Sequence, residues 1–192
     1  IYSRLLSAPN LEIVDLLSIG LALYEAEDWA RAAEAFGRVT QRVPEHHDAL
    51  LNQAYALYNG ELWSELLPVG ERLLGVDPLN SDAFQMLARA HTQLEQQQQA
   101  LAVLQRLEAL PVRADGLSLN PSTSSTTIRG NIVGHAAQAG TPIRLRFTFF
   151  DDSGANLGTQ DVTLSAPARD QSQAFSVEFG QQASAYKYQV LP

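Results

Sequence analysis

The chain carries two patterns of apolar and polar residues, and the pattern changes near residue 110. Before that point, apolar residues recur every three or four positions, which predicts helices that bury one face. The first such set is Leu16, Ile19, Gly20 and Leu23. Beyond residue 127, apolar and polar residues alternate, as in half-buried strands. In the clearest run, the apolar positions are Ile143, Leu145, Phe147 and Phe149.

The helical part repeats itself with a period of 34 residues. Small residues occupy three positions with this spacing, namely Gly20, Ala54 and Ala88. Further equivalent pairs are Trp29 with Trp63 and Pro44 with Pro78, and Pro111 follows 33 residues later. A fixed period of this length predicts stacked helix pairs, because neither helix of a pair can bury its apolar face alone. We therefore expect three repeats, at about 13–46, 47–80 and 81–114.

These positions resemble the tetratricopeptide repeat (TPR). The matching residues are Leu16, Ile19, Gly20, Trp29, Ala32, Phe36 and Pro44 in the first unit, Leu50, Ala54, Trp63, Leu66 and Pro78 in the second, and Phe84, Leu87, Ala88, Ala100, Leu104 and Pro111 in the third. Gly70 departs from the pattern, since the family usually has an aromatic residue there. The resemblance implies an α-solenoid with a concave side. Residues 1–12 would then be the end of an upstream repeat, and we expect more repeats to precede Ile1.

The second part is expected to be a small antiparallel β-sandwich of five or six strands. Strands are predicted around 128–132, 142–150, 162–164, 175–179 and 186–190, with a further one near 117–119, and residues 151–156 form a turn. The segments 130–133, 149–154, 166–167 and 188–190 resemble the bacterial FxLYD-type immunoglobulin-like domain, although Ala168 departs from its usual glycine. Such domains occur mostly in exported bacterial proteins. The resemblance therefore implies a periplasmic or extracellular location and no enzymatic role.

A domain boundary is expected near residue 115. Prolines, glycines and a Ser/Thr cluster in 111–116 and 120–127 favour a linker there. The charge changes at the same place, because the net charge of −8 lies entirely in residues 1–110 and the rest is neutral. The predicted fold class is thus an α+β multidomain chain, with a TPR α-solenoid at 1–114 and a β-sandwich at 115–192.

The sequence holds little that points to catalysis or metal binding. It has no cysteine, so disulfides, thiolate metal sites and cysteine nucleophiles are excluded. Adjacent His46 and His47 lie at a repeat junction, where a polar turn is expected, and neighbouring side chains on a helix do not face one ion. Residues 151–154 suggest a hairpin turn rather than a calcium loop. We expect no cofactor, no metal site and no enzyme.

Candidate binding residues come from the TPR resemblance, in which the first helix of each pair lines the concave groove. The matching positions are Leu17, Leu21, Tyr24, Leu51, Tyr55, Tyr58, Gln85, Arg89 and Thr92. Tyrosines near polar groups favour contact with a protein. An alternative remains open, in which upstream repeats simply bury Leu17, Leu21 and Leu51.

Two function classes therefore stand. The first is a non-enzymatic scaffold or adaptor, with the groove binding a protein partner within a bacterial envelope assembly. The alternative is a structural subunit that self-associates into an extracellular or periplasmic complex or fibre, since sheet edges and solenoid ends allow it. The acidic repeats favour a basic or neutral partner. The acidity argues against nucleic acid, and no stretch is apolar enough to span a membrane.

Overall fold

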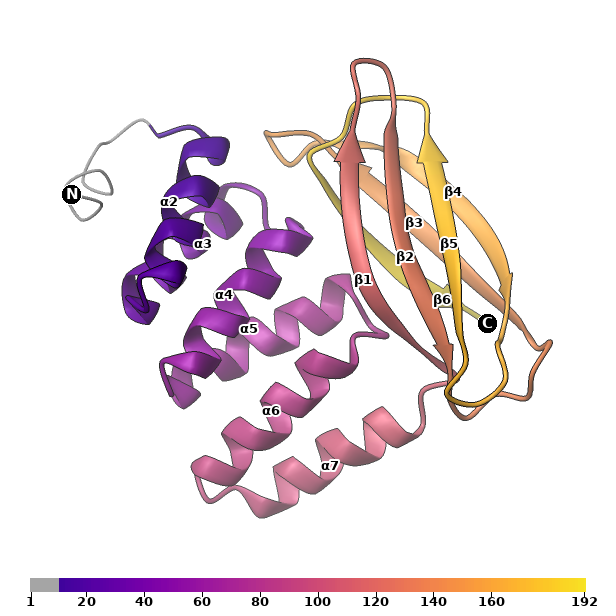
Figure 1. Cartoon of the computed structure of the whole chain (residues 1–192), viewed down its shortest axis with the longest axis horizontal. Coiled ribbons are helices and arrows are strands. Elements are labelled where there is room, and N and C mark those ends of the chain that lie inside the picture. The colour runs from indigo at the N-terminus through magenta and orange to yellow at the C-terminus, as the bar shows by residue number, and fades with distance from the viewer. Residues whose placement is uncertain (1–10) are drawn as a thin grey trace.

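The computed structural model describes residues 11–192, so most of the segment interpreted as the end of an upstream repeat, residues 1–12, falls outside the described part. Within 11–192, six helices precede six strands (Figure 1). The helices are α2 (Ile13–Glu25), α3 (Trp29–Arg42), α4 (His47–Asn59), α5 (Trp63–Val76), α6 (Ser81–Gln93) and α7 (Gln97–Glu108). The strands are β1 (Val112–Pro121), β2 (Thr126–Gly134), β3 (Pro142–Phe150), β4 (Asn156–Ser165), β5 (Ser172–Phe179) and β6 (Ala185–Leu191).

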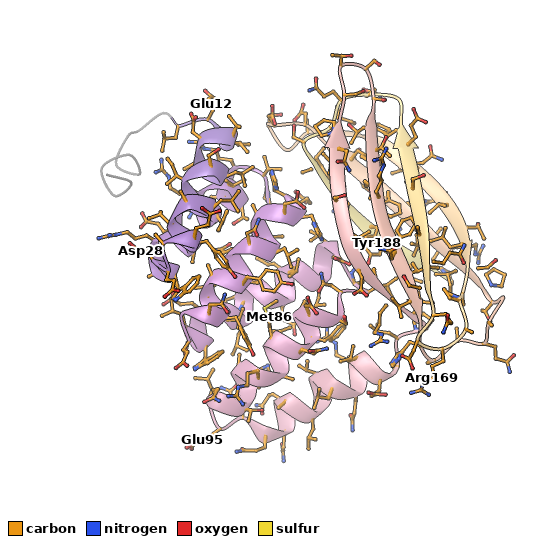
Figure 2. The ribbon with its side chains drawn as sticks, viewed as in Figure 1. Glu12, Asp28, Met86, Glu95, Arg169 and Tyr188 are labelled. Atoms are coloured by element: carbon orange, nitrogen blue, oxygen red, sulfur yellow. The ribbon has the colours of Figure 1, made fainter. Side chains whose placement is uncertain are left out.

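The backbone conformation repeats with the same 34-residue period. The turns inside the helix pairs each place one residue in the left-handed region, at Glu27, Glu61 and Glu95. The helices α2, α4 and α6 likewise begin after equivalent residues, Glu12, His46 and Asn80. Figure 2 shows Asp28 and Glu95 on the side of the helices away from the sheets. The turns inside the pairs therefore lie away from the sheets, whereas the junctions between pairs face them.

The predicted small residues let neighbouring helices approach closely. A Cβ atom on Gly20 would lie 2.6 Å from the ring of Phe36 in α3. Ala54 and Ala88 are also buried, and Phe36 is fully enclosed in the core of the helical part. Asp28 does occupy the N-cap position of α3, but it makes no capping hydrogen bond and pairs with Arg31 instead.

Two antiparallel sheets follow the helices, with strand orders β1-β2-β5 and β4-β3-β6. The apolar residues at alternate positions of β3 all point inward, as predicted, and Phe147 and Phe149 are fully buried between the sheets. The rings of Phe149 and Phe179 stack with their centroids 4.3 Å apart, which joins one sheet to the other. An α+β chain with a TPR-like helical part and two small antiparallel sheets is therefore the observed fold class.

Strands occupy much of the two segments that favoured a linker, 111–116 and 120–127. Strand β1 begins at Val112, only a few residues after α7 ends, and Thr126 already belongs to β2. Gly116 adopts a positive φ of 61° at an irregularity in the β1–β2 pairing, so the glycine marks a bulge. Residues between Pro121 and Thr126 form the tight turn of a hairpin.

The helical part and the sheets share buried residues. Leu79, from the junction between α5 and α6, is 1% exposed and belongs to the core between the sheets. Its carbonyl oxygen accepts a hydrogen bond from the backbone N–H of Ala114 in β1, at 2.9 Å. A second junction residue, His46, forms a bridge to Tyr186 in β6. Both edge strands that face the helices are thus tied to the repeats.

Candidate protein-interaction site

The nine predicted groove residues lie on the first helices of the pairs, α2, α4 and α6, in three rows related by the repeat. The rows are Leu17, Leu51 and Gln85, then Leu21, Tyr55 and Arg89, then Tyr24, Tyr58 and Thr92. Leu21 is 48% exposed, and Gln85, Arg89 and Thr92 are also exposed. The other five are half-buried against the core of the helical part. The face is therefore apolar and aromatic in α2 and α4, and polar in α6.

Hydrogen bonds fix two of the tyrosines. The Tyr55 hydroxyl donates to an Asp82 carboxylate oxygen of α6 at 2.6 Å. The Asn59 amide of α4 donates to the Tyr24 hydroxyl of α2, also at 2.6 Å. Burial, together with the nearby Asp82 carboxylate, raises the pKa of Tyr55. Tyr55 therefore stays protonated and remains a hydrogen-bond donor at neutral pH.

Tryptophans hold the last row in place. The rings of Tyr24 and Trp29 meet edge to face with their centroids 4.9 Å apart, and Tyr58 and Trp63 make the equivalent contact at 5.5 Å. Each tryptophan opens the second helix of its pair, so the pairing recurs with the repeat. Such contacts already restrict the tyrosine side chain, so it loses little conformational entropy when a partner binds.

Five of these nine residues line three hollows. Tyr58 and Arg89 line a hollow of about 270 Å³ between α4 and α6. Leu51 and Tyr55 line one of about 140 Å³, and Leu17 lines a cleft of about 530 Å³. Leu21, Tyr24, Gln85 and Thr92 line none of these three.

Strand β1 forms the opposite wall of two hollows, which the sequence did not suggest. Asp115 and Leu117 face Leu51 and Tyr55 across the smaller one. Leu119 and Pro121 line the large cleft together with residues 182–184 from the β5–β6 connection. The sheets thus contribute to the candidate surface instead of standing apart from it.

A buried polar cluster supports this arrangement at the junction of the two parts. Asp77 is 1% exposed and accepts hydrogen bonds from His47, at 2.9 Å, from Asn80, at 2.9 Å, and from the Tyr188 hydroxyl. The Tyr188 oxygen in turn accepts the backbone N–H of Leu79, at 3.2 Å. Figure 2 shows Tyr188 within the sheets. The cluster therefore fixes the sheets against the repeats.

His47 lies between two carboxylates. Its Nδ1 is 2.8 Å from Asp48 and its Nε2 is 2.9 Å from Asp77. Burial alone would lower the pKa of His47, but hydrogen bonds with Asp48 and Asp77 outweigh it and raise the pKa to about 9. The ring also stacks on Tyr186, with the centroids 4.9 Å apart. His47 is therefore an imidazolium, and its contact with Asp77 joins α4 to the junction between α5 and α6.

The turn expected at this junction lies directly before His46, and the side chains of His46 and His47 are buried beside it. In residues 11–192, no group of three or more His, Cys, Asp or Glu side chains is placed to hold a metal ion. Likewise, none of the helices in the described part is long and apolar enough to cross a membrane.

Comparison with known proteins agrees with this description of the helical part. Residues 17–65 match the family model of the tetratricopeptide repeat. No curated protein matches the chain by sequence. The FxLYD resemblance of the sheets stays a prediction.

Several solved structures are similar to part of the chain. MamA AMB-1, in its P212121 crystal form, is 19% identical with a TM-score of 0.50, and the match covers 57% of this chain and 60% of that one. MamA from residue 41 to the end, from Desulfovibrio magneticus RS-1, is 25% identical with a TM-score of 0.46, covering 50% and 54%. The chain thus spans less than two thirds of these MamA chains. The TPR match and the MamA AMB-1 fold together show that the helical part is a TPR-like solenoid.

Proposed function

We propose that the chain is a non-enzymatic scaffold or adaptor, whose concave face on α2, α4 and α6 binds a protein partner. The observation that carries the proposal is the set of half-buried tyrosines held in place by neighbouring side chains. Tyr55 is hydrogen-bonded to Asp82, and the ring of Tyr58 packs against the ring of Trp63. Rigid, partly exposed tyrosines bury a large area at low entropic cost, which is typical of residues that dominate protein interfaces.

The partner is proposed to be basic or neutral. Asp82 and Asp115 line the hollow beside Tyr55, and the whole negative excess of the chain belongs to its helical part. An acidic face attracts a basic partner during encounter, and added salt weakens that attraction.

The place of action is proposed from the FxLYD resemblance of the sheets. Domains of that kind occur mostly in exported bacterial proteins, so the scaffold would act within a periplasmic or extracellular envelope assembly. The experiment is cell fractionation of the source organism with an antibody against the chain. Recovery with the cytoplasmic fraction would contradict the proposed location and leave the binding proposal intact.

The binding proposal is tested by replacing Tyr55 and Tyr58 together with alanine. Each substitution removes a packed aromatic ring, so the affinity for the partner that co-purifies with the chain should fall at least about tenfold. Isothermal titration calorimetry measures the affinity, and circular dichroism checks that the helices remain. The matched control is Glu34→Ala with Glu65→Ala, which alters exposed residues of the second helices α3 and α5. Equal affinity of the tyrosine variant and the wild type would contradict the proposal.

A second candidate function, self-association, is favoured by the outer face of α7. Leu101 is 60% exposed and Leu104 is 42% exposed, whereas the equivalent residues Ala33 and Phe36 of α3 are buried. Solenoid ends usually carry polar outer faces. If α7 mediates self-association, Leu101→Ser with Leu104→Ser should turn an oligomer into a monomer in analytical ultracentrifugation. A wild-type chain that is monomeric at high micromolar concentration excludes this candidate.

A further inference from the structure

A large hollow lies between the helices and the sheets, at the end of the molecule where α2 begins. It measures about 530 Å³, within the range of pockets that hold a ligand. One wall is the first two turns of α2, with Val14 and Leu17, and the other is the end of β1, with Leu119 and Pro121. Figure 2 shows Glu12 at the start of α2, at the same end of the molecule as the β1–β2 hairpin.

Apolar residues line both walls of this cleft. Val14 is 66% exposed, and Leu17 and Leu119 are half-buried. Ala183 closes the cleft from the β5–β6 connection. An apolar side chain placed here would remove aliphatic surface from water on both sides.

The polar lining of the cleft is predominantly acidic. Three carboxylates, Glu12, Asp48 and Asp152, line it against one guanidinium, Arg42. Two of these groups also serve the fold. Asp48 pairs with the His47 imidazolium, and Arg42 donates to the backbone carbonyl of Leu11. The remaining excess of negative charge favours cationic side chains over anionic ones.

His46 supplies a hydrogen-bond donor to the same cleft. Its side chain is 6% exposed and lines the cleft, and its Nδ1 accepts the backbone N–H of Ala49 at 3.3 Å. Burial lowers the pKa of His46, so the ring is neutral at pH 7. Because Nδ1 is an acceptor, the single ring proton lies on Nε2. That N–H can be donated to an acceptor such as a peptide carbonyl.

We propose that this cleft binds a segment of the partner polypeptide in which an apolar side chain stands between lysines or arginines. The apolar side chain lies between Leu17 and Leu119, the basic ones approach Glu12 and Asp152, and a backbone carbonyl accepts from His46. The inference rests on the proposed function, because it assumes that the chain binds a protein. It adds that the sheets form one wall of the binding site and that the segment is basic.

The test uses a fluorescein-labelled peptide of alternating lysine and leucine, with a glutamate and leucine peptide as its acidic counterpart. Fluorescence anisotropy should show binding of the basic peptide only. Asp152→Asn removes one negative charge from the cleft and Val14→Arg adds one positive charge, so each should weaken binding by about two- to fivefold. Val14→Glu should strengthen it by about the same factor, which a purely steric effect would not do.

The controls are Glu34→Gln and Glu178→Gln, which change the net charge equally on exposed residues outside the cleft. Equal shifts in the cleft and control variants would show a general charge effect and overturn the inference, as would failure of the basic peptide to bind. A peptide that loses affinity only in the Tyr55→Ala and Tyr58→Ala variant would also overturn it, while leaving the proposed function standing. If the tyrosine variant also keeps its affinity for the co-purifying partner, the proposed function itself fails.

Discussion

The residue with the most unusual surroundings is His47. It is 2% exposed, both of its ring nitrogens face carboxylates, and a tyrosine ring covers one face. Two carboxylate partners require two N–H donors, so the folded chain holds the ring as an imidazolium. A buried charge is tolerated only where it is paired in this way.

The stability of the chain should therefore depend on pH through His47. Its pKa is raised from 6.5 to about 9 in the folded state, so its contribution is fully present below pH 6.5 and is lost as the pH rises through 9. The loss should be on the order of 3 kcal/mol at most. Urea unfolding at pH 6, 8 and 10 measures it. His47→Gln should be less stable at pH 6 and show a flatter profile, and an equally steep profile in that variant would contradict the assignment.

None of this cluster could be predicted from the sequence. Asp77 and Tyr188 are 111 residues apart, and each belongs to a different pattern, one helical and one alternating. The adjacent histidines suggested a polar turn because turns are usually solvated. They are buried because the sheets cover the junction between α3 and α4, and only the three-dimensional structure shows that contact.

At the scale of elements, the sequence was most informative where one residue type is required for packing. Gly20 was singled out as one of three small residues spaced by the repeat, and its surroundings explain why, since a Cβ atom would overlap the ring of Phe36. Only the middle of strand β1, near residues 117–119, was predicted, because Pro111 and Gly116 are typical of linkers. The backbone of β1 pairs with β2 on one side and donates a hydrogen bond to the carbonyl oxygen of Leu79 on the other.

Two glycine substitutions separate packing from helix propensity. Gly20→Ala should destabilise the chain by about 1–3 kcal/mol, because Phe36 is fully buried and cannot move away freely. Gly75→Ala, in α5, meets nothing within 4 Å and should stabilise by about 0.5–1 kcal/mol. Thermal unfolding followed by circular dichroism measures both. A stabilising Gly20→Ala would show that the two helices are less closely packed than described.

At the scale of the whole molecule, the helical part and the sheets line the same hollows from opposite sides. The sequence indicated two parts, the repeat and the alternation of the strands, because each follows from local periodicity. It gave no sign that Leu79 enters the core between the sheets or that β1 faces Tyr55. The candidate site was therefore predicted on the helical side only, and its second wall depends on contacts distant in sequence.

The central claim is that a protein partner binds the face formed by α2, α4 and α6. The most direct measurement is photo-crosslinking from a benzoylphenylalanine placed at Gln85, which is exposed on that face, compared with the same substitution at Gln41, which is exposed on the second helix α3. We expect the co-purifying partner to crosslink from position 85 and not from position 41. Crosslinks from position 41 alone, or with equal yield from both positions, would contradict the claim.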